Sequence, residues 1–191
     1  MKKIALCIAL FACSFGFSQV REKGTIEIIP TVGSTQSGTS LFTNDRSSIR
    51  LGLLGDYYFN DRWSVRSGIE LLNMGDSGFL FIQRGLELNY INIPIHANWH
   101  FGSTRKWNLN FGLTPGFLTK AEENGMDVSN VVESFQLGFA YGIGYKLEIT
   151  ENFGFLFDVQ AFAGLTNYGS NSGSDEQNVA ASWSIGAVLK L

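Results

Sequence analysis

One stretch of the chain alternates so regularly in residue character that it restricts the folds available to the whole sequence. From Ser134 to Ile149 every second residue is aromatic or aliphatic, and the residues between them are glycine, alanine or polar. Successive side chains of a β-strand point to opposite faces, so this segment predicts a strand with one wholly apolar face. That face comprises Phe135, Leu137, Phe139, Tyr141, Ile143, Tyr145, Leu147 and Ile149.

The same alternation recurs along the chain and divides it into eight expected strands. Composition supports an all-β sandwich or barrel, because aromatic residues make up 14% of the chain and there are 22 Gly against 3 Pro. Nothing between the strands reads as a linker or a repeat, which predicts a single domain. The expected strands are Thr25–Ser37, Ser47–Asn60, Arg62–Met74, Leu86–Phe101, Lys106–Lys120, Val132–Thr150, Asn152–Thr166 and Asn178–Leu191.

The connections between these strands alternate between short and long. The short ones centre on Asn60-Asp61, Gly102-Ser103 and Glu151, whereas the others, such as "AEENGMDVSNV", are long. Short periplasmic turns and longer outside loops are typical of outer-membrane barrels, and an even strand count leaves both termini on the periplasmic side. We therefore predict an all-β fold, an eight-stranded antiparallel up-and-down transmembrane β-barrel in contact with outer-membrane lipid.

The bulky apolar faces of the strands are predicted to point outward into lipid. A small barrel has an interior just wide enough for side chains to fill, and eight rows of aromatic and aliphatic residues would overfill it. Aromatic residues also flank the short turns, as Phe59 and Trp63 do at the first, and such girdles belong at membrane interfaces. The predicted lipid-facing residues are Phe135, Leu137, Phe139, Tyr141, Ile143, Phe155, Phe157 and Ile185.

The opposite faces combine small residues with charged and polar ones and are predicted to line the lumen. One interpretation is a selective channel lined by charge. The other is a paired network that plugs the barrel, because unpaired buried charge is costly. The small number of strands favours the plug, since conducting porins have many more. The predicted lumen network comprises Arg50, Asp56, Arg66, Glu70, His96, His100, Lys120, Lys146, Glu148, Asp158 and Lys190.

Residues 1–18 have the three-part pattern of a secretory signal peptide, with a basic start, an apolar run and small residues before the cut. Cleavage is predicted after Ser18, which leaves residues 19–191 for the barrel. A membrane anchor would need a run of roughly 20 apolar residues, and a lipoprotein signal at Cys13 is a further alternative. Both cysteines, Cys7 and Cys13, lie in this segment, so the exported chain is expected to contain no disulfide.

His96 and His100 are the two histidines, and their spacing of four places them on one strand face. They could form a metal pair or an acid–base group, or act as polar filler; a metal site usually needs three or four suitable ligands. Hydrolase or acyltransferase chemistry would need a serine beside a histidine, and no local motif supplies one. The loop Gly169–Asn178 lacks the spaced carboxylates of a calcium loop. We predict no catalytic, cofactor-binding or metal-binding residue.

The segment Leu86–Phe101 contains Tyr90-Ile91-Asn92-Ile93-Pro94, and it resembles a strand of the PorT-like or OmpX-like outer-membrane β-barrel domain family of Bacteroidetes-type bacteria. Val65–Gly75 resembles the preceding strand of that family and its glycine-bearing loop. The resemblance spans the exported chain and implies an integral outer-membrane barrel, with some members linked to protein secretion or gliding. It brings no catalytic residues. Pro94 lacks a ladder donor, so we expect a bulge there and a change of inside–outside phase near Tyr90.

The expected function is that of a non-enzymatic integral protein of the cell outer membrane. Its role would be structural, partner-binding, or that of a subunit of envelope or secretion machinery, with the long outside loops contacting other envelope proteins. Two alternatives remain, a soluble lipocalin-like ligand-binding barrel and a small outer-membrane barrel enzyme. A formal net charge of -3 gives no indication of nucleic-acid binding.

Overall fold

The computed structural model describes residues 21–38, 46–76, 86–167 and 177–191, and its regular elements in these ranges are all β-strands. The predicted signal peptide, and most of the loop Gly169–Asn178, lie outside the described residues. The strands are β1 (Ile26–Gly38), β2 (Arg46–Tyr58), β3 (Trp63–Asp76), β4 (Leu86–Asn92), β5 (Ile95–Phe101), β6 (Trp107–Glu123), β7 (Met126–Asp127), β8 (Phe135–Glu148), β9 (Phe153–Asn167) and β10 (Gln177–Lys190).

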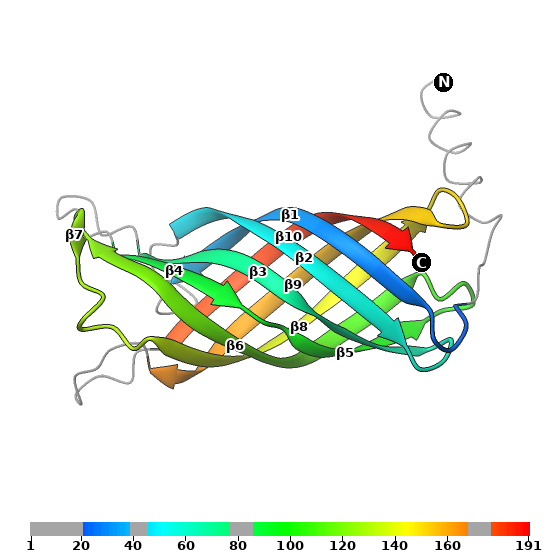
Figure 1. The fold of residues 1–191 in the computed structure, drawn as a ribbon, viewed down its shortest axis with the longest axis horizontal. Coiled ribbons are helices and arrows are strands. Elements are labelled where there is room, and N and C mark those ends of the chain that lie inside the picture. The colour runs from blue at the N-terminus through cyan, green and yellow to red at the C-terminus, as the bar shows by residue number, and fades with distance from the viewer. Residues whose placement is uncertain (1–20, 39–45, 77–85, 168–176) are drawn as a thin grey trace, which may run out of the picture.

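These strands form a closed antiparallel barrel with eight strand positions, which confirms the predicted fold (Figure 1). We call each strand position of the barrel wall a stave. β4 and β5 are two parts of one stave, because both pair with β3 on one side and β6 on the other. β7 is a two-residue strand that pairs with the end of β6. The barrel closes where β1, which also pairs with β2, pairs with β10. No described segment forms a helix with the length and apolar character that a membrane span requires.

The two ends of the barrel differ. The short connections 59–62, 102–106 and 149–152 lie at one end, together with the start of β1 and the C-terminus (right in Figure 1). We call this the short-turn end. The described connection 124–134 lies at the opposite end, together with the end of β1, the start of β2, the end of β3, the start of β4, the end of β9 and the start of β10, and we call it the long-loop end. Both described chain ends therefore lie on the same side of the barrel, as an even number of staves requires.

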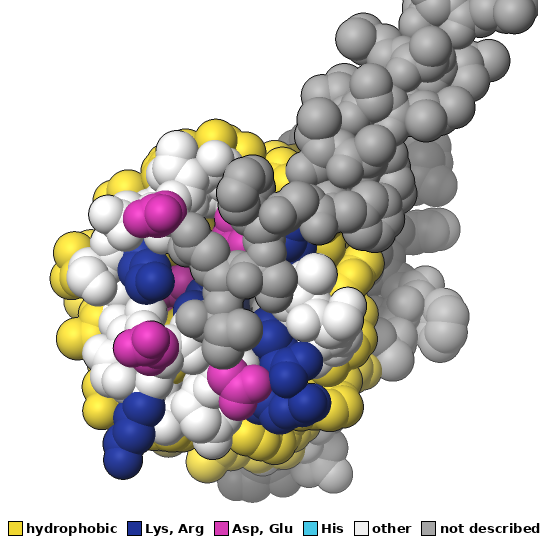
Figure 2. Space-filling model, turned by 90° about the vertical axis from the view of Figure 1, so that its right-hand side faces the viewer, with side chains coloured by type: hydrophobic (Ala, Val, Ile, Leu, Met, Phe, Trp, Pro, Cys, Tyr) yellow, Lys and Arg dark blue, Asp and Glu magenta, His cyan; other side chains and the backbone are white. Residues whose placement is uncertain are grey.

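Apolar side chains cover the outside of the barrel. Phe135, Phe139 and Ile143 are 44%, 38% and 41% exposed, so none of them belongs to an internal core. Viewed from the short-turn end, hydrophobic side chains surround the rim while charged side chains occupy the middle (Figure 2). The outer ring near the short turns is an aromatic belt, in which successive ring centroids lie 4.8–6.5 Å apart from Trp63 through Trp99, Phe101 and Trp107 to Tyr145.

Pro94 interrupts the stave without changing its register. Asn92 is opposite Glu70 and Ile95 is opposite Ser67. Two residues separate these positions on each strand, so neither strand has an extra residue at the break. Tyr90 and Asn92 are both buried, and inward-facing residues remain the even-numbered ones from Leu88 to His100. The expected bulge at Pro94 and the expected change of phase near Tyr90 are therefore wrong. What changes there is the chemistry of the lumen, which becomes apolar toward the long-loop end.

A bulge does occur, but on the neighbouring strand. On β6, Leu118 pairs with Tyr90 and Lys120 pairs with Asn89. Thr119 is therefore an extra residue on β6, opposite the peptide bond between Asn89 and Tyr90. One inserted residue moves the following side chain to the other face of the sheet. Lys120, predicted to line the lumen, instead lies on the outer surface with its side chain 56% exposed and paired with Glu122 at 2.9 Å.

Candidate functional site: the filled lumen

The barrel interior is the part of the molecule where polar chemistry is concentrated. Of the residues predicted to line the lumen, the structure buries Arg50, Asp56, Arg66, Glu70, His96, His100, Lys146 and Asp158. Glu148 and Lys190 are partly buried at the short-turn end, and both line a cavity at this mouth of the barrel. Lys120 is the exception described above.

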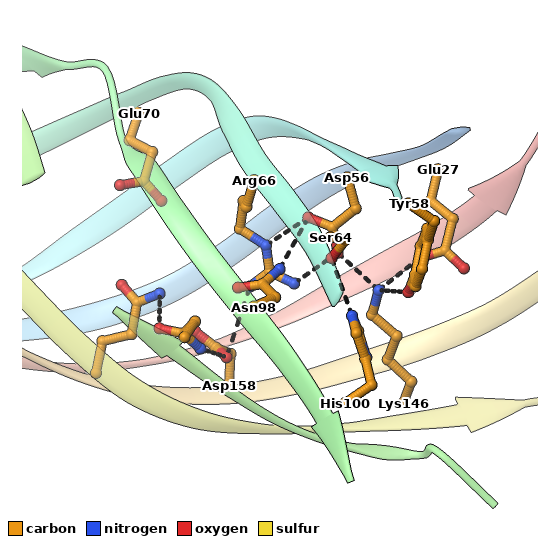
Figure 3. Close-up of polar contacts among 12 residues, drawn as sticks. Glu27, Asp56, Tyr58, Ser64, Arg66, Glu70, Asn98, His100, Lys146 and Asp158 are labelled. Carbon is orange, nitrogen blue, oxygen red and sulfur yellow. Dashed lines mark hydrogen bonds and ion pairs between the residues drawn. The ribbon is translucent and has the colours of Figure 1, made fainter. Parts of the chain in front are cut away.

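Asp56 and Lys146 form the centre of the charge network (Figure 3). Arg66 donates to both oxygens of Asp56, from Nε at 2.8 Å and from Nη2 at 3.0 Å. Lys146 Nζ donates to Asp56 Oδ2 at 2.7 Å, to Glu27 Oε2 at 2.5 Å and to the Tyr58 hydroxyl at 2.9 Å. These charge-assisted bonds neutralise carboxylates that have no access to solvent.

Arg21 closes the network at the short-turn end. Its Nε donates to Glu27 at 2.5 Å and its Nη1 donates to Glu148 at 2.8 Å, while the guanidinium lies 5.6 Å from the centre of the Tyr58 ring. Burial by itself would lower the pKa of Arg21, but Tyr58 and the carboxylates Glu27 and Glu148 raise it above its ordinary value. The side chain is therefore a permanent cation between two acidic groups.

A second group of contacts continues the network toward the middle of the barrel. Arg50 donates to Glu70 at 2.5 Å, to Gln160 at 2.8 Å and to Ser182 at 2.6 Å. Asp158 accepts from Asn110 at 2.9 Å, and Arg66 Nη1 lies 3.7 Å from its carboxylate. Strands from all around the barrel are therefore joined through the lumen.

The buried charges of the described interior are of both signs. Five buried cationic side chains, Arg21, Arg50, Arg66, Lys106 and Lys146, lie among four buried carboxylates, Glu27, Asp56, Glu70 and Asp158. The partly buried Glu148 and Lys190 add one charge of each sign at the short-turn end. A pore that selects ions presents a surplus of one sign along its wall, whereas a structural plug pairs its buried charges. The pairing geometry matches the plug.

The two histidines contact different hydroxyl groups and do not form a pair. His96 Nε2 lies 2.8 Å from Thr114 Oγ1, and His100 Nε2 lies 2.9 Å from Ser64 Oγ. Within the described ranges, no group of three or more potential metal-ligating side chains is found.

Ser64 and His100 are a serine–histidine pair of the kind that nucleophilic catalysis uses. Both side chains are completely buried, and the His100 ring lies against Tyr58 with 4.9 Å between ring centroids. His100 Nδ1 has no hydrogen-bond partner in the described chain, so a third group that would orient the ring is missing there.

An apolar cluster fills the lumen at the long-loop end. Four partly buried residues pack against this cluster: Leu118, Val128, Val132 and Phe162. The Val128 backbone N–H also donates to the Ala121 carbonyl at 3.0 Å. A smaller cluster lies on the inner faces of β1, β2, β9 and β10 and comprises Ile29, Leu54, Leu156 and Val188. The buried members of the larger cluster are Leu72, Met74, Leu88, Tyr90, Ala121 and Ala180.

Sequence reasoning missed several of these residues. Glu27 lies between the outward-facing Ile26 and Ile28, so extending the alternation to the first strand would have placed it inside. The same alternation would have placed Leu88 and Tyr90 inside the barrel, but because both side chains are apolar they were expected to face outward. Arg21 precedes the first strand, and no pattern in the sequence indicated its burial.

A model of the family described as "Outer membrane protein beta-barrel domain" matches residues 13–170 of the chain. The chain belongs to this family. No curated protein matches it. The family and the closed fold together place this barrel in the outer membrane, with its apolar outer surface in lipid.

Solved outer-membrane barrels have the same fold. Ail, the attachment invasion locus protein of Yersinia pestis, solved with the heparin analogue sucrose octasulfate, is 18% identical with a TM-score of 0.53, covering 88% of this chain and 99% of Ail. Neisserial surface protein A is 14% identical with a TM-score of 0.57 over 88% and 99% of the two chains. OprG from Pseudomonas aeruginosa is 16% identical with a TM-score of 0.52 over 89% and 97%. At these identities the similarity establishes the fold alone.

Proposed function

We propose that this outer-membrane protein is a closed, non-enzymatic barrel that anchors a binding surface at its long-loop end. The observation that carries the proposal is the filled lumen, in which paired charges occupy the short-turn half and an apolar cluster occupies the other. A barrel of this kind does not act by transporting solutes. Its role is structural, partner-binding, or that of a subunit of envelope or secretion machinery, because what it exposes to the exterior is the loop surface.

The charge of the described long-loop end bears on the partner. Glu122, Glu123, Asp127 and Glu133 surround the β6–β8 connection, and Lys120 there is paired with Glu122. Ail was solved with a sulfated heparin analogue, but an acidic surface repels polyanions. We therefore expect a neutral or cationic partner for this chain, such as a basic segment of another envelope protein.

Two finer assignments belong to the same proposal. Cleavage after Ser18 would begin the exported chain shortly before Arg21, the first described residue of the lumen network. The Tyr90–Pro94 motif and the Val65–Gly75 segment support membership of the PorT-like branch, with its links to secretion and gliding.

Two measurements test the proposed function. In planar lipid bilayers the refolded protein is expected to give no stable conductance steps, and reproducible single-channel steps would contradict the plug. Crosslinking followed by co-purification from the native outer membrane in detergent is expected to recover the protein with defined envelope neighbours. Recovery of the barrel alone, at every crosslinker length, would contradict a partner-binding role.

The buried Ser64–His100 pair makes hydrolase activity the second function to test. We expect the refolded protein to hydrolyse ester and phospholipid substrates no faster than the S64A variant does. A rate that is lost on replacing Ser64 or His100, but kept on replacing His96, would establish an enzyme and overturn the proposal.

A further inference from the structure

A small cavity lies inside the barrel where the polar network meets the apolar cluster. Its volume is about 20 Å³. Arg50, Asn92 and His96 form its polar side, and Leu72, Phe162 and Ala180 form its apolar side. The cavity is therefore walled on one side by the charge network and on the other by the packing that fills the long-loop end.

Four polar atoms in side chains that line this cavity have no hydrogen-bond partner within the described chain. They are Thr35 Oγ1, Arg50 Nε, Asn92 Oδ1 and His96 Nδ1. All four side chains are more than nine-tenths buried. The remaining polar atoms of Arg50 and His96 are held by other residues, since Arg50 contacts Glu70 and Ser182, and His96 Nε2 contacts Thr114. Leaving four such atoms unsatisfied in one place would be costly.

The size and the chemistry of the cavity select its ligand. A cavity of about 10–15 Å³ is large enough for one water, which needs two to four polar partners. Arg50 Nε can only donate, Asn92 Oδ1 accepts, and Thr35 and His96 can do either. Water both donates and accepts, whereas an anion only accepts and would be repelled by the nearby Glu70. A cation would be repelled by Arg50.

We propose that this cavity is a binding site for ordered water, held by Thr35, Arg50, Asn92 and His96. These residues lie on β1, β2, β4 and β5. Asn92 and His96 stand on either side of the break at Ile93–Pro94, where Pro94 has no N–H to donate although Ile93 N–H still donates to the Pro115 carbonyl at 2.9 Å. The water therefore connects the two halves of the interrupted stave to each other and to the opposite wall of the lumen.

A crystal structure of the refolded barrel grown in bromide tests this site directly. The expected result is a peak within hydrogen-bonding distance of Arg50 Nε and His96 Nδ1, without anomalous signal from bromide, and no peak among Ile29, Leu54, Leu156 and Val188. A cavity without density, or one with an anomalous peak, overturns the proposal.

Solution NMR in lipid nanodiscs provides an independent readout through magnetisation transfer from water to the His96 side chain. The isosteric variant T35V should weaken this transfer, because the water loses one partner. The matched control T31V changes the same residue type on the inner face of β1, outside the cavity lining, and should leave the transfer unchanged. Equal transfer in the wild type and in both variants would overturn the assignment of Thr35.

Discussion

Lys146 has three partners inside the barrel, and all of them depend on its charge. Glu27 comes from β1, and Asp56 and Tyr58 come from β2, whereas Lys146 itself lies on β8. β8 meets β1 and β2 only through the lumen, since β8 pairs with β6 and β9. The ammonium group therefore holds together parts of the wall that share no backbone hydrogen bonds.

Replacing this lysine tests the network at the scale of one residue. We expect K146M to destabilise the barrel by about 3–5 kcal/mol, because breaking a buried ion pair leaves an uncompensated charge. The measurement is the urea dependence of tryptophan fluorescence in lipid vesicles. K120M removes the same charge from the outer surface and should change the unfolding midpoint little. Equal effects of the two substitutions would contradict the filled, charge-paired lumen.

The sequence places Lys146 on the inner face of a strand, but it cannot identify its partners. Alternation assigns each side chain to a face, and this is a local property. Glu27 and Lys146 are 119 residues apart, and their contact depends on the relative stagger of strands across the whole barrel. The faces could therefore be predicted from the sequence, whereas the pairs could not.

At the scale of the strand, boundaries were predictable and irregularities were not. The expected segment Asn152–Thr166 corresponds to β9 at Phe153–Asn167, because the alternation stops where the turn begins. The bulge at Thr119 and the unbroken register at Pro94 were both missed. A proline can be seen in the sequence, whereas a bulge depends on how a strand pairs with its neighbour. The bulge at Thr119 could therefore not be predicted, and Lys120 was assigned to the wrong face.

Inward-facing glycines make room for the charge network. A Cβ at Gly144 would lie 2.7 Å from Asp158 Oδ1 and 2.8 Å from Asn108 Nδ2. Gly55 faces outward on β2, between the exposed Leu53 and Tyr57. The atom nearest to a Cβ added there, the Glu27 carbonyl oxygen, is 3.7 Å away. G144A should destabilise the barrel by about 1–3 kcal/mol through overpacking. G55A should be neutral or stabilising by about 0.4–1 kcal/mol. Equilibrium unfolding in vesicles distinguishes them, and equal stability of the two variants would contradict the tight packing.

The outer face of β8 provides a test of membrane depth along one strand. Tyr141, at mid-strand, is 56% exposed, and Phe135 is the first residue of β8 at the long-loop end. Y141R should cost about 2–4 kcal/mol and F135R about 0–1 kcal/mol, because the penalty for arginine is greatest at the bilayer midplane. Folding titrations in vesicles measure both values. A larger penalty at Phe135 would contradict the placement of mid-β8 in the hydrocarbon core.

At the scale of the whole molecule, the pairing of β1 with β10 is what makes the sheet a barrel. Val32 and Ile185 are directly opposite each other on the outer face of this pair. Opposed residues in an antiparallel pair have Cα atoms about 4.5–5.5 Å apart, within the range of a disulfide. The double variant V32C/I185C should therefore crosslink on oxidation and migrate differently from its reduced form after boiling.

The control pair for this experiment is V32C/F157C. Phe157 lies opposite Ile185 on β9, one strand farther from Val32. Two strand spacings amount to about 9.5 Å, which is too far for a disulfide. An open sheet would fail to crosslink in both variants.

The long sequence separation of the interior ion pairs constrains how the protein is made. Arg21 meets Glu148 across 127 residues and Lys146 meets Asp56 across 90. A partly assembled sheet that entered the hydrocarbon would carry these charges with no counter-ion, which costs free energy. The charge network is therefore complete only when strands from both ends of the chain have come together, as the contacts of Arg21 with Glu148 require.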